Sequence, residues 1–144
     1  MSRDIPVAQI VFKEKYVTIS FDPTTGFVLL DWHSYATSGQ FRHTITTLLA
    51  FVESKSKSHA HIGLLADTVK LGVITKEDIE WNAKEINPYI FKAGVKKVAF
   101  IIPENIFTQL SITTYQQQTK VEDTGSLISQ MFADRASAQK WLSE

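Results

Sequence analysis

The sequence contains no cysteine among its 144 residues. Disulfides, thiolate zinc sites, cysteine nucleophiles and cysteine-ligated iron–sulfur clusters are therefore excluded. There is also no apolar run of 18 residues, and residues 1–6 carry no apolar signal core. We therefore expect a cytoplasmic protein without membrane insertion.

An excess of charge of either sign is also lacking, since 15 Lys and Arg residues balance 15 Asp and Glu residues. A neutral chain does not attract nucleic acid or acidic membrane over its whole surface, so we expect no nucleic-acid partner. The hydrophobic share of 44% and charged share of 21% are ordinary for a folded protein. No linker of Pro, Gly or Ser divides the chain, which predicts a single domain over residues 1–144.

Complete catalytic and phosphate-binding motifs are absent as well. The sequence contains neither of the glycine-rich loops that bind phosphates, G-x-G-x-x-G and G-x-x-x-x-G-K-[ST]. It also contains no G-x-S-x-G nucleophile motif. Asp31 and His33 are two residues apart at a strand end, which favours ordinary polar residues over an acid–base pair. His59 and His61 could form half of a metal site, but no third ligand has suitable spacing. We therefore expect no catalytic residue, no metal and no cofactor, and predict that the chain is not an enzyme.

The first third of the sequence is typical of strands. Residues 7–12 form a short apolar–polar run, and residues 16–22 alternate so that Val17, Ile19 and Phe21 share one face. The turn residues at 23–26 then lead into a second run at 27–32. These last two runs predict an antiparallel hairpin with a four-residue loop.

Helices and strands alternate in the rest of the chain. Ser38 is the expected N-cap of a first helix, and Thr75 the expected N-cap of a second, which Pro88 should kink or stop. The predicted apolar stripes are Phe41, Ile45, Leu48, Leu49 and Val52 in the first helix and Ile79, Ala83, Ile86 and Ile90 in the second. Between them, residues 61–66 are apolar almost without interruption, as in a strand covered on both faces.

The last part of the chain continues the alternation. We expect strands at residues 95–102 and 126–132, a helix at 105–116, and a final helix capped by Asp134 with Ala138, Trp141 and Leu142 facing inward. The predicted fold class is α/β, with a mixed β-sheet in which N-terminal antiparallel strands are followed by alternating helices and parallel strands.

Two positions are candidates for function. Asp67 and Thr68 end a buried strand, at the edge of an α/β sheet where ligands and switches tend to lie. A hydroxyl there could accept a phosphate and gain about −2 charge, although a side-chain cap at the strand exit is the simpler interpretation. Trp81 flanks the stripe of its helix, so it could belong to an interface or wrap over the core.

The order of several segments resembles the SpoIIAA-like proteins, small bacterial domains grouped with the STAS and Sec14-like folds. The resemblance is carried by residues 64–68, 72–81, 94–100, 131–134 and 138–142. It implies an α/β fold and a regulatory or binding role rather than a reaction. In the STAS anti-sigma-factor antagonists a phosphorylatable serine follows a strand in an Asp-Ser-Ser-Gly segment. The matching segment here is Asp67-Thr68-Val69-Lys70, which keeps only the aspartate and one hydroxyl.

Two functions remain open at this point. The first is a regulatory or protein-interaction domain with a protein partner, and the resemblance to STAS proteins implies it. The alternative is a small apolar-ligand or lipid-binding domain of Sec14-like type, which the nine phenylalanines would suit. A homodimer built on the outer face or edge of the N-terminal hairpin is a separate expectation.

Overall fold

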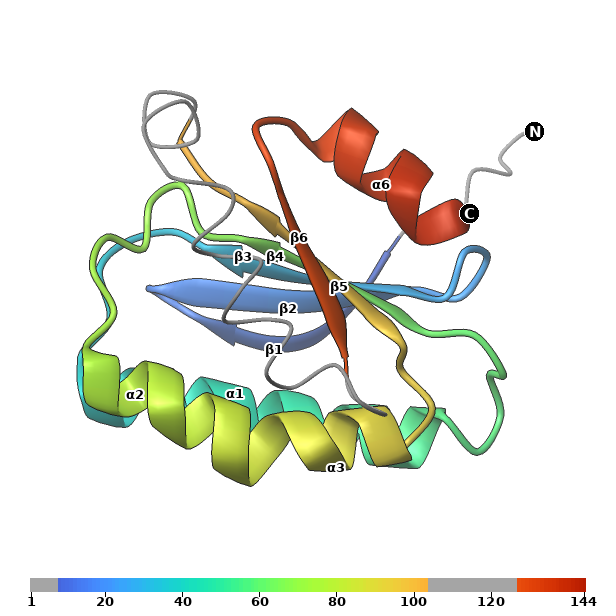
Figure 1. Cartoon of the computed structure of the whole chain (residues 1–144), viewed down its shortest axis with the longest axis horizontal. Helices are drawn as coiled ribbons and strands as arrows, with labels where there is room; N and C mark the ends of the chain where they lie inside the picture. Colours follow the sequence, from blue (N-terminus) through green and yellow to red (C-terminus); the bar gives the residue numbers. More distant parts are fainter. Residues whose placement is uncertain (1–7, 104–126) are drawn as a thin grey trace.

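The computed structural model describes residues 8–103 and 127–144, which form one six-stranded sheet in the order β1-β2-β3-β4-β5-β6 (Figure 1). The strands are β1 (Gln9–Glu14), β2 (Val17–Asp22), β3 (Phe27–Trp32), β4 (Gly63–Asp67), β5 (Lys97–Ile101) and β6 (Ile128–Phe132). The first three pair in antiparallel fashion, and β3 to β6 pair in parallel. The predicted α/β fold with a mixed sheet is thereby confirmed.

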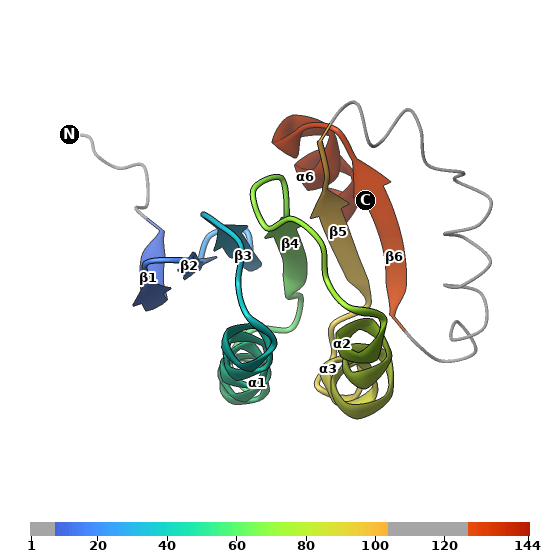
Figure 2. The same ribbon diagram turned by 90° about the vertical axis from the view of Figure 1, so that its left-hand side faces the viewer.

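The described helices are α1 (Ser38–Lys55), α2 (Lys76–Trp81), the π-helix η1 (Asn82–Ile86), α3 (Asn87–Lys92) and α6 (Arg135–Ser143). The first four lie on one face of the sheet and α6 lies on the other (Figure 2). Because β3, β4 and β5 are sequential neighbours, right-handed crossovers place α1 and the α2–η1–α3 rod on the same side. None of the described helices combines the length and the apolar character needed to cross a membrane.

The N-terminal hairpin follows its alternating pattern. Val17, Ile19 and Phe21 are fully buried towards α1, as predicted. Gly26 in the hairpin loop has φ +80°, and a side chain there would collide with the backbone oxygen of His61. The glycine therefore lets the loop approach the start of β4.

The core has two parts, one on each face of the sheet. Leu64 belongs to the large cluster under α1 and α3, whereas its neighbour Leu65 packs with Ala99, Ile101 and Ala138 beneath α6. Strand β4, with its uninterrupted apolar run, is thus covered on both faces, as predicted. The strand begins at Gly63 rather than His61, and the predicted helix at residues 105–116 lies outside the described residues.

The first helix corrects the predicted cap. Thr37, not Ser38, is the N-cap: its hydroxyl accepts a hydrogen bond from the Gln40 backbone, and the Gln40 side chain accepts one from the Thr37 backbone. This reciprocal capping box satisfies two backbone N–H groups. The Ser38 hydroxyl is consequently available to donate to Asp78 in the second helix.

The second helix departs further from its predicted stripe. Ile86 and Ile90 are buried as expected, but Ile79 is 53% exposed and Asp78 takes the inward position. Pro88 neither stops nor breaks the helix, because the wider π turn of η1 precedes it and Pro88 itself lies in the first turn of α3. A π turn accommodates a residue that cannot donate to the α-helical ladder. Its extra width also shifts which side chains face the core.

Candidate functional site

The predicted site at Asp67 and Thr68 lies at the carboxyl edge of the parallel strands. Asp67 is the last residue of β4, and the parallel register places it beside Asp31 of β3. Both strands end at the edge where α1, α2 and α6 begin (Figure 1). Two carboxylates on neighbouring strands need a cation between them, since like charges at this spacing repel.

Arg135, the first residue of α6, supplies that cation. Its Nε and Nη2 contact Asp67 Oδ2 at 2.9 and 2.8 Å, and Nη2 lies 3.2 Å from Asp31 Oδ1. Burial alone would lower the pKa of Arg135, but the hydrogen bond to Asp67 and the two carboxylate charges raise it. The three side chains therefore form an ion cluster, with one guanidinium shared by two carboxylates, that joins α6 to β3 and β4.

The position of α6 follows from its cap. Asp134 Oδ1 accepts a hydrogen bond of 2.8 Å from the Ser137 backbone, which confirms the predicted N-cap. Ala138 is fully buried, and Trp141 and Leu142 pack partly buried beside it, so the predicted inward face is confirmed.

Thr68 is held by the neighbouring strand. Its backbone N–H and its hydroxyl both donate to the carbonyl of Ile101, at 2.9 and 2.8 Å. Asp67 Oδ1 in turn accepts from the backbone of Val69 at 3.2 Å. This is the side-chain cap that was the simpler interpretation of the pair. Modification of Thr68 stays a prediction, and a phosphate would first have to break the bond to Ile101.

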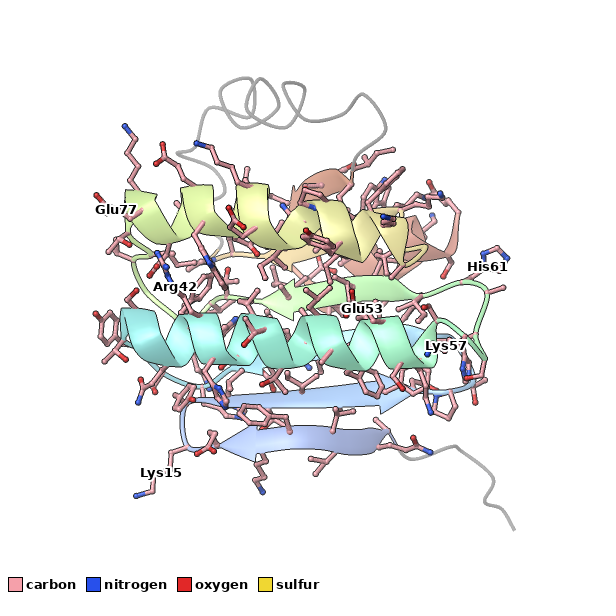
Figure 3. All side chains as sticks on the ribbon, turned by 90° about the horizontal axis from the view of Figure 1, so that it is seen from below. Lys15, Arg42, Glu53, Lys57, His61 and Glu77 are labelled. Carbon is pink, nitrogen blue, oxygen red and sulfur yellow. The ribbon has the colours of Figure 1, made fainter. Side chains whose placement is uncertain are left out.

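A second polar cluster joins α1 to α2. Asp78 is only 3% exposed, and its Oδ1 accepts from Ser38 Oγ and Arg42 Nε, each at 2.8 Å. Burial by itself would raise the pKa of Asp78, but the hydrogen bonds from Arg42 and Ser38 and the charge of Arg42 lower it. Figure 3 shows Arg42 between the two helices. No local sequence pattern reveals this cluster, because Arg42 and Ser38 lie 36 and 40 positions before Asp78.

Trp81 belongs to the same junction. The Arg42 guanidinium lies 4.8 Å from the centre of its ring, and Phe41 meets it edge-on at 6.5 Å. The ring is half-buried against the main core. Its contacts match the interpretation of a residue wrapped over the core, and its role in an interface stays untested.

The other polar candidates make separate contacts. Asp31 pairs with Arg135, whereas His33 Nε2 lies 2.7 Å from Thr18 Oγ1. His59 and His61 precede β4 rather than lying on it, so they do not share a strand face. Among the described residues, no group of three or more His, Asp or Glu side chains is placed to hold a metal ion.

Three exposed apolar side chains lie in the two loops at the carboxyl edge. Tyr35 in the β3–α1 loop is 64% exposed, and Val69 and Val73 in the β4–α2 loop are 41% and 83% exposed. The buried Leu71 anchors the second loop between the two valines, and Gly72, at φ +83°, turns it beside Tyr35. We call Tyr35, Val69 and Val73 the apolar loop patch. The hollow beside it, lined by Tyr35 and Val73 among others, holds about 20 Å³.

Comparison of the chain with known protein families, with curated proteins and with solved structures gives no match.

Proposed function

We propose that this protein is a regulatory or protein-interaction domain that binds its partner through the apolar loop patch. The observation that carries the proposal is the exposure of Tyr35, Val69 and Val73 on two loops beside a closed ion cluster. Exposed apolar groups that gather in one region mark interaction sites, because each costs free energy in water.

The shape of the patch favours a protein partner over a small molecule. A small-molecule site encloses roughly 300–1,000 Å³, whereas the hollow beside Tyr35 and Val73 holds about 20 Å³. Of the neighbouring carboxylates, Asp31 and Asp67 share Arg135, and Asp78 pairs with Arg42. Beside these paired carboxylates, the apolar loop patch offers a partner apolar contact.

The resemblance to SpoIIAA-like and STAS domains supports the same proposal. The arrangement of two antiparallel strand pairs followed by a parallel sheet is consistent with that bacterial family. The switch serine of the anti-sigma-factor antagonists corresponds to Thr68, whose hydroxyl here holds the β4–α2 loop to β5. We therefore propose a partner surface that does not depend on phosphorylation of Thr68.

The alternative of a lipid or apolar-ligand site of Sec14-like type has weaker support. The space between the sheet and the α1 and α3 helices is apolar, with Leu48, Ile90 and Leu127 in its wall, but it holds about 50 Å³. A lipid chain would have to separate α1 from α3. We rank this function second, and native mass spectrometry of gently purified protein would support it through a retained lipid mass.

The test compares two exposed tyrosines. We immobilise the wild type, the double variant Tyr35→Ser/Val73→Asp and the control Tyr89→Ser, and use each to capture proteins from a native extract. Tyr89 serves as the control because it is a tyrosine on α3 that is 51% exposed. A candidate partner is then purified and its affinity measured. We expect the patch variant to bind at least about tenfold more weakly, as loss of an interface hot spot does. Equal affinity of all three proteins, or no specific partner, contradicts the proposal.

A further inference from the structure

The amino edge of the parallel strands differs from the carboxyl edge in its charge. Helices α1, α3 and α6 all end there, because each runs back along the sheet before the next strand or the end of the described chain. Lysines accumulate in these last turns and in the segments that follow them: Lys55, Lys57, Lys92, Lys96, Lys97 and Lys140. In Figure 3, Lys57 and His61 lie at this end and Glu77 lies at the opposite end. Cations suit the negative ends of helix dipoles.

An open basin of about 580 Å³ lies at this edge, between the hairpin loop, the starts of β4 and β5, and the end of α6. Its apolar wall includes Phe27, Ile62 and Leu142. Gly63 lies between them, and a Cβ added there would be 3.3 Å from Phe27 and 3.4 Å from Leu142. A larger residue at Gly63 would push against these two side chains, so the glycine helps to keep the wall in place.

The polar side of the basin holds a positioned ammonium group. Lys97 Nζ donates to the backbone oxygens of Trp141 and Glu144 at 3.0 and 3.1 Å, and it lies 4.9 Å from the centre of the Trp141 ring. These contacts fix the ammonium group of Lys97 at the end of α6, where two main-chain oxygens accept its hydrogen bonds.

A second ammonium group is available to a ligand. Lys96 is exposed, its Nζ lies 4.6 Å from the centre of the Phe91 ring, and it forms no ion pair with a described residue. The exposed His61 and the hydroxyls of Thr25 and Ser143 also line the basin. Glu144 is the one acidic residue in this lining.

We propose that this basin binds a small organic anion, a carboxylate that carries an aromatic or short aliphatic body. The volume lies in the range of small-molecule sites, roughly 300–1,000 Å³. The apolar wall receives the body of the ligand. Lys97 lies on the α6 side of the basin and Lys96 on the α3 side, and the exposed Lys96 attracts the carboxylate at the rim. This site is distinct from the apolar loop patch, since the two lie at opposite edges of the sheet.

The experiment is an NMR titration of the full chain with 4-phenylbutyrate and with its neutral amide. We expect the carboxylate to shift the backbone amides of Gly63 and Gly94 and the indole of Trp141, which lie in or beside the basin. Because the charge contributes to binding, the amide should bind about tenfold more weakly. Equal shifts with both compounds, or shifts away from the basin, overturn the proposal.

Two variants separate binding at the basin from general charge effects. Lys96→Glu should weaken binding of 4-phenylbutyrate about tenfold. Lys76→Glu, the same change at an exposed lysine of the opposite edge, should leave binding unchanged. If both variants weaken binding equally, or neither does, the basin is not the site. None of these results depends on the partner proposed for the apolar loop patch.

Discussion

The two edges of the parallel sheet use charge in different ways. At the carboxyl edge, each carboxylate of Asp31, Asp67 and Asp78 is paired with an arginine. At the amino edge, no lysine forms an ion pair with a described Asp or Glu side chain, and Lys97 instead donates to main-chain oxygens. The described residues therefore place arginine-paired acids at one edge of the sheet and lysines at the other.

The choice of cation follows from this difference. Arg42 and Arg135 are the arginines of the described residues, and both lie at the carboxyl edge. A guanidinium is weakly hydrated and presents several fixed donors, so it can join two elements through buried or partly buried carboxylates. An ammonium group is strongly hydrated and suits an exposed basin. We infer that the two arginines hold helices in place at the carboxyl edge, whereas Lys96 at the amino edge stays accessible.

The largest expected effect is at Asp78. Replacing it with Ala removes the acceptor for Ser38 and Arg42 and leaves their donors unpaired. Because Asp78 is buried and Arg42 is partly exposed, we expect a loss of about 2–3 kcal/mol in the free energy of unfolding. Urea unfolding followed by circular dichroism measures it. Glu77→Ala, at the exposed neighbour, should change the value by less than about 0.5 kcal/mol.

The effect of pH provides a second check on the same residue. The pKa of Asp78 is lowered in the folded state, so its contribution is present above its unfolded pKa of about 3.9. It is lost as the pH falls through the lower folded value. The difference in stability between wild type and Asp78→Asn should therefore be constant from pH 5 to 7 and shrink below about pH 4. A difference that grows on acidification would contradict the assigned pairing.

The Asp78 cluster also shows what the sequence can and cannot predict. Patterns within a single element were sufficient for the hairpin, for the buried face of α1 and for the two-sided burial of β4. In each case the spacing of apolar residues determines which face is buried. Asp67 and Thr68 were also placed correctly at a strand end, because a strand exit is a local feature.

The ion clusters could not be predicted in the same way. Arg135 contacts a carboxylate 68 positions earlier, and no local spacing marks either partner. The burial of Asp78 requires α1 to lie beside α2, which only the assembled sheet determines. The burial of Ile79 was predicted from regular helical spacing, and this prediction is wrong. The π turn before Pro88 changes the spacing, and no local pattern in the sequence indicates that turn.

A smaller effect is expected at Arg135. Replacing it with Met leaves Asp31 and Asp67 adjacent without their shared cation. The side chains are partly exposed, so solvent screens their interaction and we expect a loss of about 1 kcal/mol. Arg135→Lys should recover only part of it, because an ammonium cannot reproduce the Nε and Nη2 contacts. Full recovery in the Lys variant would show that charge alone matters at this edge.

The smallest effect is expected at Lys97 and tests whether the amino edge contributes to stability at all. Lys97→Met keeps the aliphatic stem but removes the ammonium that caps the last turn of α6. A cation at an exposed helix C-terminus contributes about 0.5 kcal/mol, and salt screens it. The loss should therefore be measurable by urea unfolding at low ionic strength and vanish near 1 M salt.

Lys96→Met is the control: it removes a neighbouring lysine that contacts no helix-end carbonyl of the described residues, so it should change stability little at any salt concentration. Equal losses in the two variants would mean that the amino edge responds to total charge. Its lysines would then not divide into one that holds α6 and one that is available to a ligand.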